Sequence, residues 1–214
     1  MAEMDGAWQV GQYDCFHSIG NLLCGCCCGP CTFASGLVKT YTSWGICDCC
    51  FMFCVGGAGG YTLMRKGYFV EGSDWGDCCY VTCCMMCCGI PACHVANESE
   101  MRGVKEYKNT QRNPNPADFR EGYFGFCHDI IGCLYGHCCP WCAYAGLTSD
   151  YAGTGCCYSC CCIAPALTRY DMRHQYNIDG HCCTDICAVS CCPGCGYVQM
   201  KNELQVMGPV FLPG

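Results

Sequence analysis

The sequence predicts a small, cysteine-rich, mainly α-helical protein with irregular loops, built as two tandem homologous units stapled by disulfides (or zinc). Three observations predict this fold class: the cysteine content, a helical spacing of cysteines, and the repetition of that spacing. Cysteine accounts for 33 of the 214 residues, a density typical of disulfide or metal scaffolds. Charged residues make up only 14% of the chain, so we expect the protein to hide or share much of its surface.

Two cysteine-rich segments carry the helical spacing. DCCYVTCCMMCC, which ends at residue 88, matches HCCTDICAVSCC, which ends at residue 192. Cysteines at i, i+4 and i+8 lie along one face of a helix. The ladder residues are Cys79, Cys83 and Cys87 in the first segment, and Cys183, Cys187 and Cys191 in the second. Gly and Pro after each segment predict the helix ends. We expect the ladders to supply disulfide partners or, because cysteine also acts as a small hydrophobe, a core face.

Internal similarity divides the rest of the chain as well. CCGPC at 27–31 matches CCPWC at 138–142, and RKGY at 65–68 matches RHQY at 173–176. Residues 97–122 contain no cysteine and include two Asn-Pro steps, which break regular structure. We therefore predict unit 1 at residues 8–110, an Asn/Pro linker at 111–118, unit 2 at 119–205 and an apolar tail at 206–214.

The cysteines allow two chemical interpretations. In the first, Cys-x-x-Cys pairs bind zinc, because a gap of two residues lets both sulfurs reach one metal at about 2.3 Å. The candidate ligands are Cys28, Cys31, Cys139, Cys142, Cys192 and Cys195. In the second, disulfides replace core burial in a chain poor in large aliphatic residues, and no cofactor is required. The odd cysteine count then leaves at least one thiol free or bonded to another chain.

Charge and motifs exclude several functions. The net charge of −7 and only 11 Lys and Arg residues argue against a nucleic-acid partner. The chain has no Ser-His-Asp order, no HExxH and no phosphate loop, so we expect no enzyme. The N-terminal residues show no secretory signal, and a reducing compartment is then the default. A disulfide-bonded protein would instead reach the cell surface or exterior by an unconventional route.

The CCGPC and CCPWC motifs resemble the Cys-Pro-Cys signature of the placenta-specific-8 family, which includes cornifelin, plant cadmium-resistance proteins and cell-number regulators. Each copy here has one residue more than that signature. Residues 181–204, HCCTDICAVSCCPGCGYVQMKNEL, look like the family's C-terminal block. The resemblance implies a non-catalytic cysteine-rich domain, often at the cell periphery or membrane-associated. It also implies a link to metal handling in plants and to a cross-linked envelope in skin.

These observations predict a non-enzymatic, self-associating structural protein cross-linked by disulfides, such as a filament or sheath subunit. Its partner would be further copies of itself, in a homo-oligomer or polymer. The alternative is a zinc-binding protein of metal-ion homeostasis or transport, cytoplasmic or at the membrane periphery. The first function predicts oxidised sulfur and little metal, whereas the second predicts zinc and free thiols.

Overall fold

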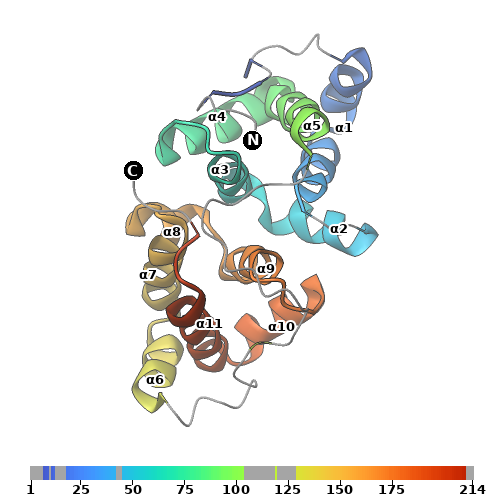
Figure 1. Cartoon of the computed structure of the whole chain (residues 1–214). Helices are drawn as coiled ribbons and strands as arrows, with labels where there is room; N and C mark the ends of the chain where they lie inside the picture. The colour runs from blue at the N-terminus through green and yellow to red at the C-terminus, as the bar shows by residue number, and fades with distance from the viewer. Residues whose placement is uncertain are drawn as a thin grey trace. The chain divides into compact units, whose positions relative to one another are not determined.

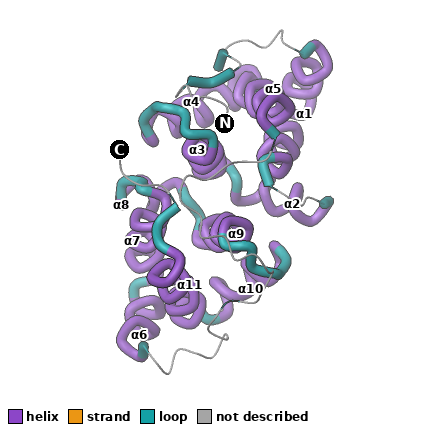
Figure 2. Tube along the Cα trace, viewed as in Figure 1, coloured by secondary structure: helices purple, strands orange, loops and turns teal. Residues whose placement is uncertain are grey.

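A computed structural model describes residues 7–9, 11–12, 18–41, 45–103, 119 and 129–210. At residues 22, 26–27 and 85–88 it describes the backbone only. The chain forms two compact units, residues 1–106 and 107–214. The described residues contain helices and loops and no strand (Figure 2). The predicted mainly helical class is therefore confirmed, whereas the predicted linker at 111–118 lies outside the described residues.

Unit 1 contains five described helices (Figure 1). They are α1 (Ile19–Lys39), α2 (Ile46–Val55), α3 (Gly57–Gly67), α4 (Asp74–Cys88) and α5 (Ile90–Arg102). Ser18 and Ser73 begin α1 and α4 by accepting hydrogen bonds from backbone N–H groups of the first turn. α1 leaves helical geometry at Cys28 (φ −134°, ψ 44°), just before Pro30, which has no N–H to donate. α5 packs along α1 and forms the main contact of the unit.

Unit 2 contains six described helices. They are α6 (Ile130–Cys138), α7 (Pro140–Ala152), α8 (Cys156–Cys162), α9 (Pro165–Gln175), α10 (Cys182–Cys191) and α11 (Pro193–Met207). Proline opens α7, α9 and α11, where its missing N–H removes no helical hydrogen bond. Cys139 separates α6 from α7 with φ −132° and ψ 58°. These backbone angles are similar to those of Cys28, where α1 of unit 1 breaks. α11 packs against α6, α7 and α10 and so holds the unit together.

Tyrosines contribute more to the two cores than cysteines do. Tyr61, Tyr151, Tyr158, Tyr170 and Tyr176 are each at most 2% exposed. Such rings bury a large apolar area while their hydroxyls keep a polar partner. Tyr151 donates to Asp171 Oδ2 at 2.8 Å, and Tyr176 donates to the backbone carbonyl of Gly208 at 2.8 Å. The buried cysteines of the described side chains are Cys93, Cys182 and Cys195.

Disulfides between helices do not hold the described residues together. The one disulfide among them joins Cys192 to Cys195, which are separated by three positions. The predicted disulfides between helices are therefore absent from the described residues. The two cysteine ladders lie on helices, α4 and α10, as predicted. Cysteine packs less apolar area than an aromatic ring, and here tyrosines supply the burial that cross-links were expected to replace.

The described part of the predicted apolar tail belongs to unit 2. Met207 ends α11 and is buried, and Val210 is 1% exposed. The Val210 N–H donates to the carbonyl of Tyr151 at 3.1 Å. The beginning of this tail therefore packs on its own unit.

None of the described helices is by itself both long and apolar enough to cross a bilayer. α2 and α3 meet the criterion only as a pair, and that pair bends by 110°. Most of α3 is buried inside unit 1.

Asp129 anchors the start of α6, and its removal should weaken unit 2. It accepts from the Gly132 N–H at 2.8 Å, and Lys201 of α11 donates to its other oxygen at 2.6 Å. These bonds, Lys201 first, hold the pKa of the Asp129 carboxyl below its usual value. We expect Asp129→Ala to cost about 1 kcal/mol at pH 7, typical of a lost N-cap. Because the folded-state pKa is lowered, the stabilisation is lost as pH falls below about 4.

Urea unfolding of both proteins at pH 7 and pH 3 checks this prediction. The difference between wild type and variant should shrink at pH 3, and Asp150→Ala, at an exposed position of α7, should change stability little at either pH. An equal difference at both pH values would contradict the role of the charged carboxylate.

Candidate functional site

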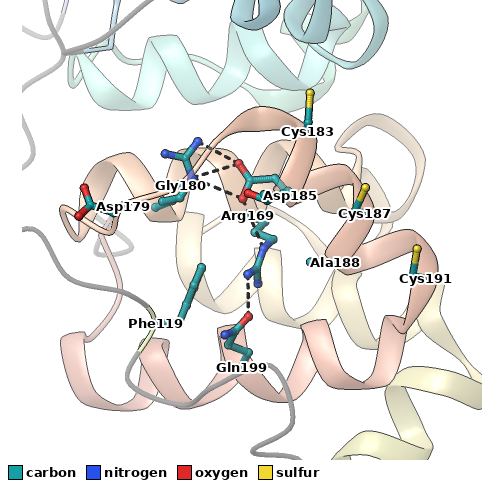
Figure 3. Close-up of a pocket in the computed structure, with 12 residues that line it drawn as sticks. Phe119, Arg169, Asp179, Gly180, Cys183, Asp185, Cys187, Ala188, Cys191 and Gln199 are labelled. Atoms are coloured by element: carbon teal, nitrogen blue, oxygen red, sulfur yellow. Dashed lines mark hydrogen bonds and ion pairs between the residues drawn. The ribbon is translucent and has the colours of Figure 1, made fainter.

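A buried cluster of two arginines and one aspartate lies between α9, α10 and α11 of unit 2 (Figure 3). Arg173 donates to Asp185 Oδ2 from Nη2 at 3.0 Å and from Nε at 3.1 Å. Arg169 pairs with Asp185 Oδ1 at 3.4 Å and donates to Gln199 Oε1 at 2.6 Å. Its guanidinium also lies 4.0 Å from the centroid of the Phe119 ring. The cluster therefore joins α9, α10 and α11 by charge and hydrogen bonds.

Two local features of the α9–α10 connection place Arg173. Asn177 has φ 54°, a left-handed conformation that asparagine tolerates better than most residues. Gly180 lies against the Arg173 stem, where a Cβ would come within 2.9 Å of Cδ. A side chain at position 180 would push the arginine away from Asp185. The connection is thus shaped for a buried ion pair.

A pocket of ≈ 640 Å³ opens beside this cluster. Arg169, Arg173 and Gln199 line it together with the cysteines of α10. Figure 3 shows the sulfur atoms of Cys183, Cys187 and Cys191 in line along α10, all pointing the same way. All three are exposed free thiols, and we call them the α10 thiol row. A row of nucleophilic, soft sulfur atoms therefore borders a pocket that contains buried charges.

Unit 1 has a similar cluster. Arg65 Nε donates to Asp77 Oδ2 at 2.7 Å, and Thr62 donates to the same oxygen at 2.9 Å. Arg65 also donates to Asp74 at 2.8 Å. Gly72 lies against the Arg65 stem, where a Cβ would be 3.1 Å from Cδ. The two units thus bury an arginine–aspartate pair by the same local means, while their origin by duplication stays a prediction.

The unit 1 pocket, of ≈ 500 Å³, is also bordered by thiols. Cys79 and Cys83 line it as exposed free thiols, and we call them the α4 thiol row; the Cys87 side chain lies outside the described residues. Counted from the paired aspartates, Cys79 stands where Cys187 does, and Cys83 where Cys191 does. When the two segments are instead aligned by their last residues, Cys79 corresponds to Cys183. That position is one helical turn before Cys187, and the two alignments differ because α4 is longer than α10.

The direction of the two rows limits their chemistry. Neighbouring sulfurs of a row project from one helix face a turn apart, a poor geometry for a disulfide between them. A disulfide that ties these thiols to another helix or another chain needs a partner from outside their own row. Their predicted use as disulfide partners stays a prediction.

The predicted zinc ligands lie in several places. Cys28 and Cys31 are exposed on α1, Cys139 and Cys142 are exposed at the α6–α7 break, and Cys192 and Cys195 form the disulfide. Within the described ranges, no three His, Cys, Asp or Glu side chains come together in a way that could hold a metal ion. A zinc site built from the six named cysteines stays a prediction.

A second group of thiols lies on α8, outside the candidate ligands named from the sequence. Cys156, Cys157, Cys160 and Cys161 are exposed, whereas Tyr158 and Ser159 between them are buried. Desolvation and the neighbouring thiols, including Cys161 and Cys142, raise the pKa of Cys160. We call these four residues and Cys142 the α8 thiol face. The spacing i, i+1, i+4, i+5 is the signal that could have identified it.

The buried arginine–aspartate clusters were also missed. The signal was present in RKGY and RHQY, each followed twelve residues after its arginine by an aspartate, at positions 77 and 185. Charged residues are rarely buried unless paired, and a sequence does not reveal such pairs. The clusters tie helices together and leave the surface thiols to carry any chemistry.

Comparison with known proteins identifies similar chains. The sequence profile of the PLAC8 family matches residues 119–203. Placenta-specific gene 8 protein of Homo sapiens is 31% identical over 86 residues, which cover 40% of this chain and 68% of that protein. Cornifelin homolog B of Xenopus laevis is 29% identical over 107 residues, covering 48% of this chain and 86% of that protein.

A plant protein shows higher identity over a shorter stretch. Protein PLANT CADMIUM RESISTANCE 2 of Arabidopsis thaliana is 43% identical over 49 residues, 23% of this chain. That match spans about a third of the plant protein's length, 32%. No solved structure matches the chain significantly.

Proposed function

This chain belongs to the PLAC8 family of cysteine-rich proteins, and from that premise we propose that it is a non-enzymatic structural protein whose surface thiols cross-link it to further copies of itself. The observation that carries the proposal is the direction of the thiol rows. The described cysteines of the two rows are exposed free thiols: Cys79 and Cys83 on α4, and Cys183, Cys187 and Cys191 on α10. A folded chain therefore presents its thiols to other molecules.

The cores support this proposal because they do not use those thiols. Buried tyrosines and arginine–aspartate pairs hold each unit together. The rows can then be oxidised or reduced without removing core contacts. In-line sulfurs on rigid helices also suit pairing with a matching row on another copy, since both rows repeat at the helical period.

Mild oxidation of the purified chain tests the proposal. We expect the wild-type protein, treated with oxidised glutathione, to form disulfide-linked dimers and larger oligomers. Their molecular mass is measured without reductant, and adding a reductant should return them to monomers. The triple variant Cys183→Ser, Cys187→Ser, Cys191→Ser should lose most of these species. A matched triple variant, Cys156→Ser, Cys157→Ser, Cys160→Ser, removes as many exposed thiols from α8 and should retain them. Equal cross-linking by both variants, or none by wild type, would refute the role of the α10 row.

A second candidate function, binding of a soft metal ion, rests on the α8 thiol face. Thiolates are the preferred ligands of zinc and related soft ions, and they must lose their protons to bind. Cys142 on α7 and three neighbouring thiols on α8 lie close enough to Cys160 to help raise its pKa. The Arabidopsis relative carries cadmium resistance in its name. Among the described residues no three such ligands come together in a way that could hold a metal ion, so these thiols would have to move to bind one.

This alternative places the chain at a membrane periphery. Apolar side chains on α6 and α7 support it by their exposure: Ile130 61%, Ile131 82%, Leu134 59% and Trp141 65%. Such side chains, next to exposed thiols, could rest in the interfacial region of a bilayer.

Cadmium titration separates the two candidates. Under reducing conditions we expect the metal-binding function to produce a thiolate-to-cadmium absorption band and to release protons. Cys142→Ser combined with Cys160→Ser should abolish tight binding, whereas Cys183→Ser with Cys187→Ser should preserve it. Binding that is unchanged in the first variant would exclude the α8 thiol face as the site.

A further inference from the structure

The disulfide of unit 2 lies at the N-terminus of a long helix. Cys192 is the N-cap of α11, Pro193 and Gly194 form its first two positions, and Cys195 is the third. Cys-x-x-Cys pairs at helix starts are the arrangement in which one thiol is activated and the other is held beside it. The positive end of the helix stabilises a thiolate at the N-cap.

The two sulfurs differ in access. Cys192 is half-buried, whereas Cys195 is only 5% exposed. An incoming thiol therefore has better access to Cys192 than to Cys195. This difference defines an order of events, because the accessible cysteine makes contact with the substrate and the buried cysteine closes or opens the bond.

The surroundings hold the pair in place. The Tyr144 hydroxyl donates to the carbonyl of Pro193 at 2.9 Å, and the Gly196 N–H donates to the carbonyl of Cys192 at 3.0 Å. Gly194 lies against the backbone carbonyl of Cys133 in α6, where a side chain would clash. The Cys-Pro-Gly-Cys turn is thus packed from α6 and α7 on its inner side, with Cys192 at its rim.

We propose that Cys192 and Cys195 form a redox-active dithiol–disulfide site that exchanges with thiol substrates. A substrate thiolate attacks Cys192 Sγ, the bond between Cys192 and Cys195 breaks, and Cys195 leaves as a thiolate that takes up a proton. A second substrate thiolate attacks the mixed disulfide and releases Cys192, which also takes up a proton. Two substrate thiols lose two electrons and two protons to form a disulfide, and the cysteine pair gains both.

Unit 1 supplies an internal control. Its helix α5 begins after Gly89, not after a cysteine, at the N-cap. Cys93, in the first turns of α5, is 1% exposed, and its thiol donates to the Asn21 carbonyl at 3.0 Å. A buried helical cysteine without an N-cap partner should not exchange. The proposed site is independent of cross-linking by the thiol rows and goes beyond that structural role.

Redox titration of the full-length chain tests the proposal. The protein is equilibrated in glutathione buffers of graded ratio and blocked with iodoacetamide. After full reduction a second label is added, and peptide fragmentation assigns the label on each cysteine. We expect Cys192 and Cys195 to change from oxidised to reduced together within the series. The ratio of reduced to oxidised pair should rise with the square of the concentration of reduced glutathione. Cys93 should carry no glutathione in any buffer.

Two single variants test the order of attack. The Cys195→Ser variant should accumulate a glutathione mixed disulfide at Cys192. In the Cys192→Ser variant, glutathione should modify Cys195 at least about tenfold more slowly than it modifies Cys192 in the first variant, because Cys195 is buried. A pair that stays oxidised in every buffer would be an inert cross-link and would overturn the proposal. Equal modification of both variants, with circular dichroism confirming that both are folded, would overturn it as well. Neither result depends on whether the α10 row variant cross-links.

Discussion

Asp185→Ala is expected to destabilise unit 2 by about 3–5 kcal/mol, because it leaves two buried guanidinium groups without their carboxylate. The Asp185 side chain is 1% exposed, and those of Arg169 and Arg173 are 7% and 6% exposed. Hydrogen exchange, followed peptide by peptide, measures the loss separately in each unit.

An exposed ion pair provides the matched control. Lys39 and Glu100 lie 3.2 Å apart with 37% and 47% of their side chains exposed, so Glu100→Ala should cost no more than about 1 kcal/mol. Asp77→Ala should reproduce the large effect in unit 1. If Asp185→Ala changed exchange in unit 2 no more than Glu100→Ala does in unit 1, the buried cluster would not be what holds α9 to α10.

Gly194→Ala is expected to destabilise unit 2 by about 1–3 kcal/mol, the usual cost of forcing atoms into a packed interior. The new methyl group would meet the backbone carbonyl of Cys133, which cannot rotate away as a side chain can. α11 would have to move off α6. Thermal unfolding followed by circular dichroism measures the effect.

Gly146→Ala serves as the control with the opposite sign. Gly146 lies inside α7, and no atom comes within 4 Å of the Cβ that alanine would add. Alanine there should stabilise the helix by about 0.5–1 kcal/mol, because glycine loses more backbone entropy on folding. Two Gly→Ala changes of the same sign and size would show that propensity, and not the approach of α11 to α6, controls the outcome.

Local patterns predicted the helices well. The cysteine spacing at 79–87 and 183–191 indicated helices, and α4 and α10 are helices that end where Gly89 and Pro193 were expected to end them. Pro30 and Pro140 mark the breaks beside Cys28 and Cys139. These features depend on neighbouring residues along the chain, so the sequence contains all that is needed to find them.

The candidate site could be predicted only in part. The sequence identified which cysteines share a face, but cysteine is found both in cores and on surfaces, so periodicity did not say which way Cys187 or Cys191 would point. The pairing of Asp185 with Arg173 and the position of Cys142 beside α8 depend on contacts between separate helices. Counted from the buried ion pairs, Cys79 lies one helical turn from the position that the end-to-end match of the segments gives it, and only the structure shows those pairs.

The sequence by itself determined the helical class, the ends of the two cysteine-ladder helices and the membership of a cysteine-rich family, since propensity, caps and motifs are properties of short segments. The tertiary structure alone decided that tyrosines and ion pairs form the cores, that the thiol rows face outward, and that Cys192 is accessible while Cys195 is buried. Burial is a property of the packed helices, and the same thiol is a core atom or a reactive group according to which side of a helix its neighbours cover.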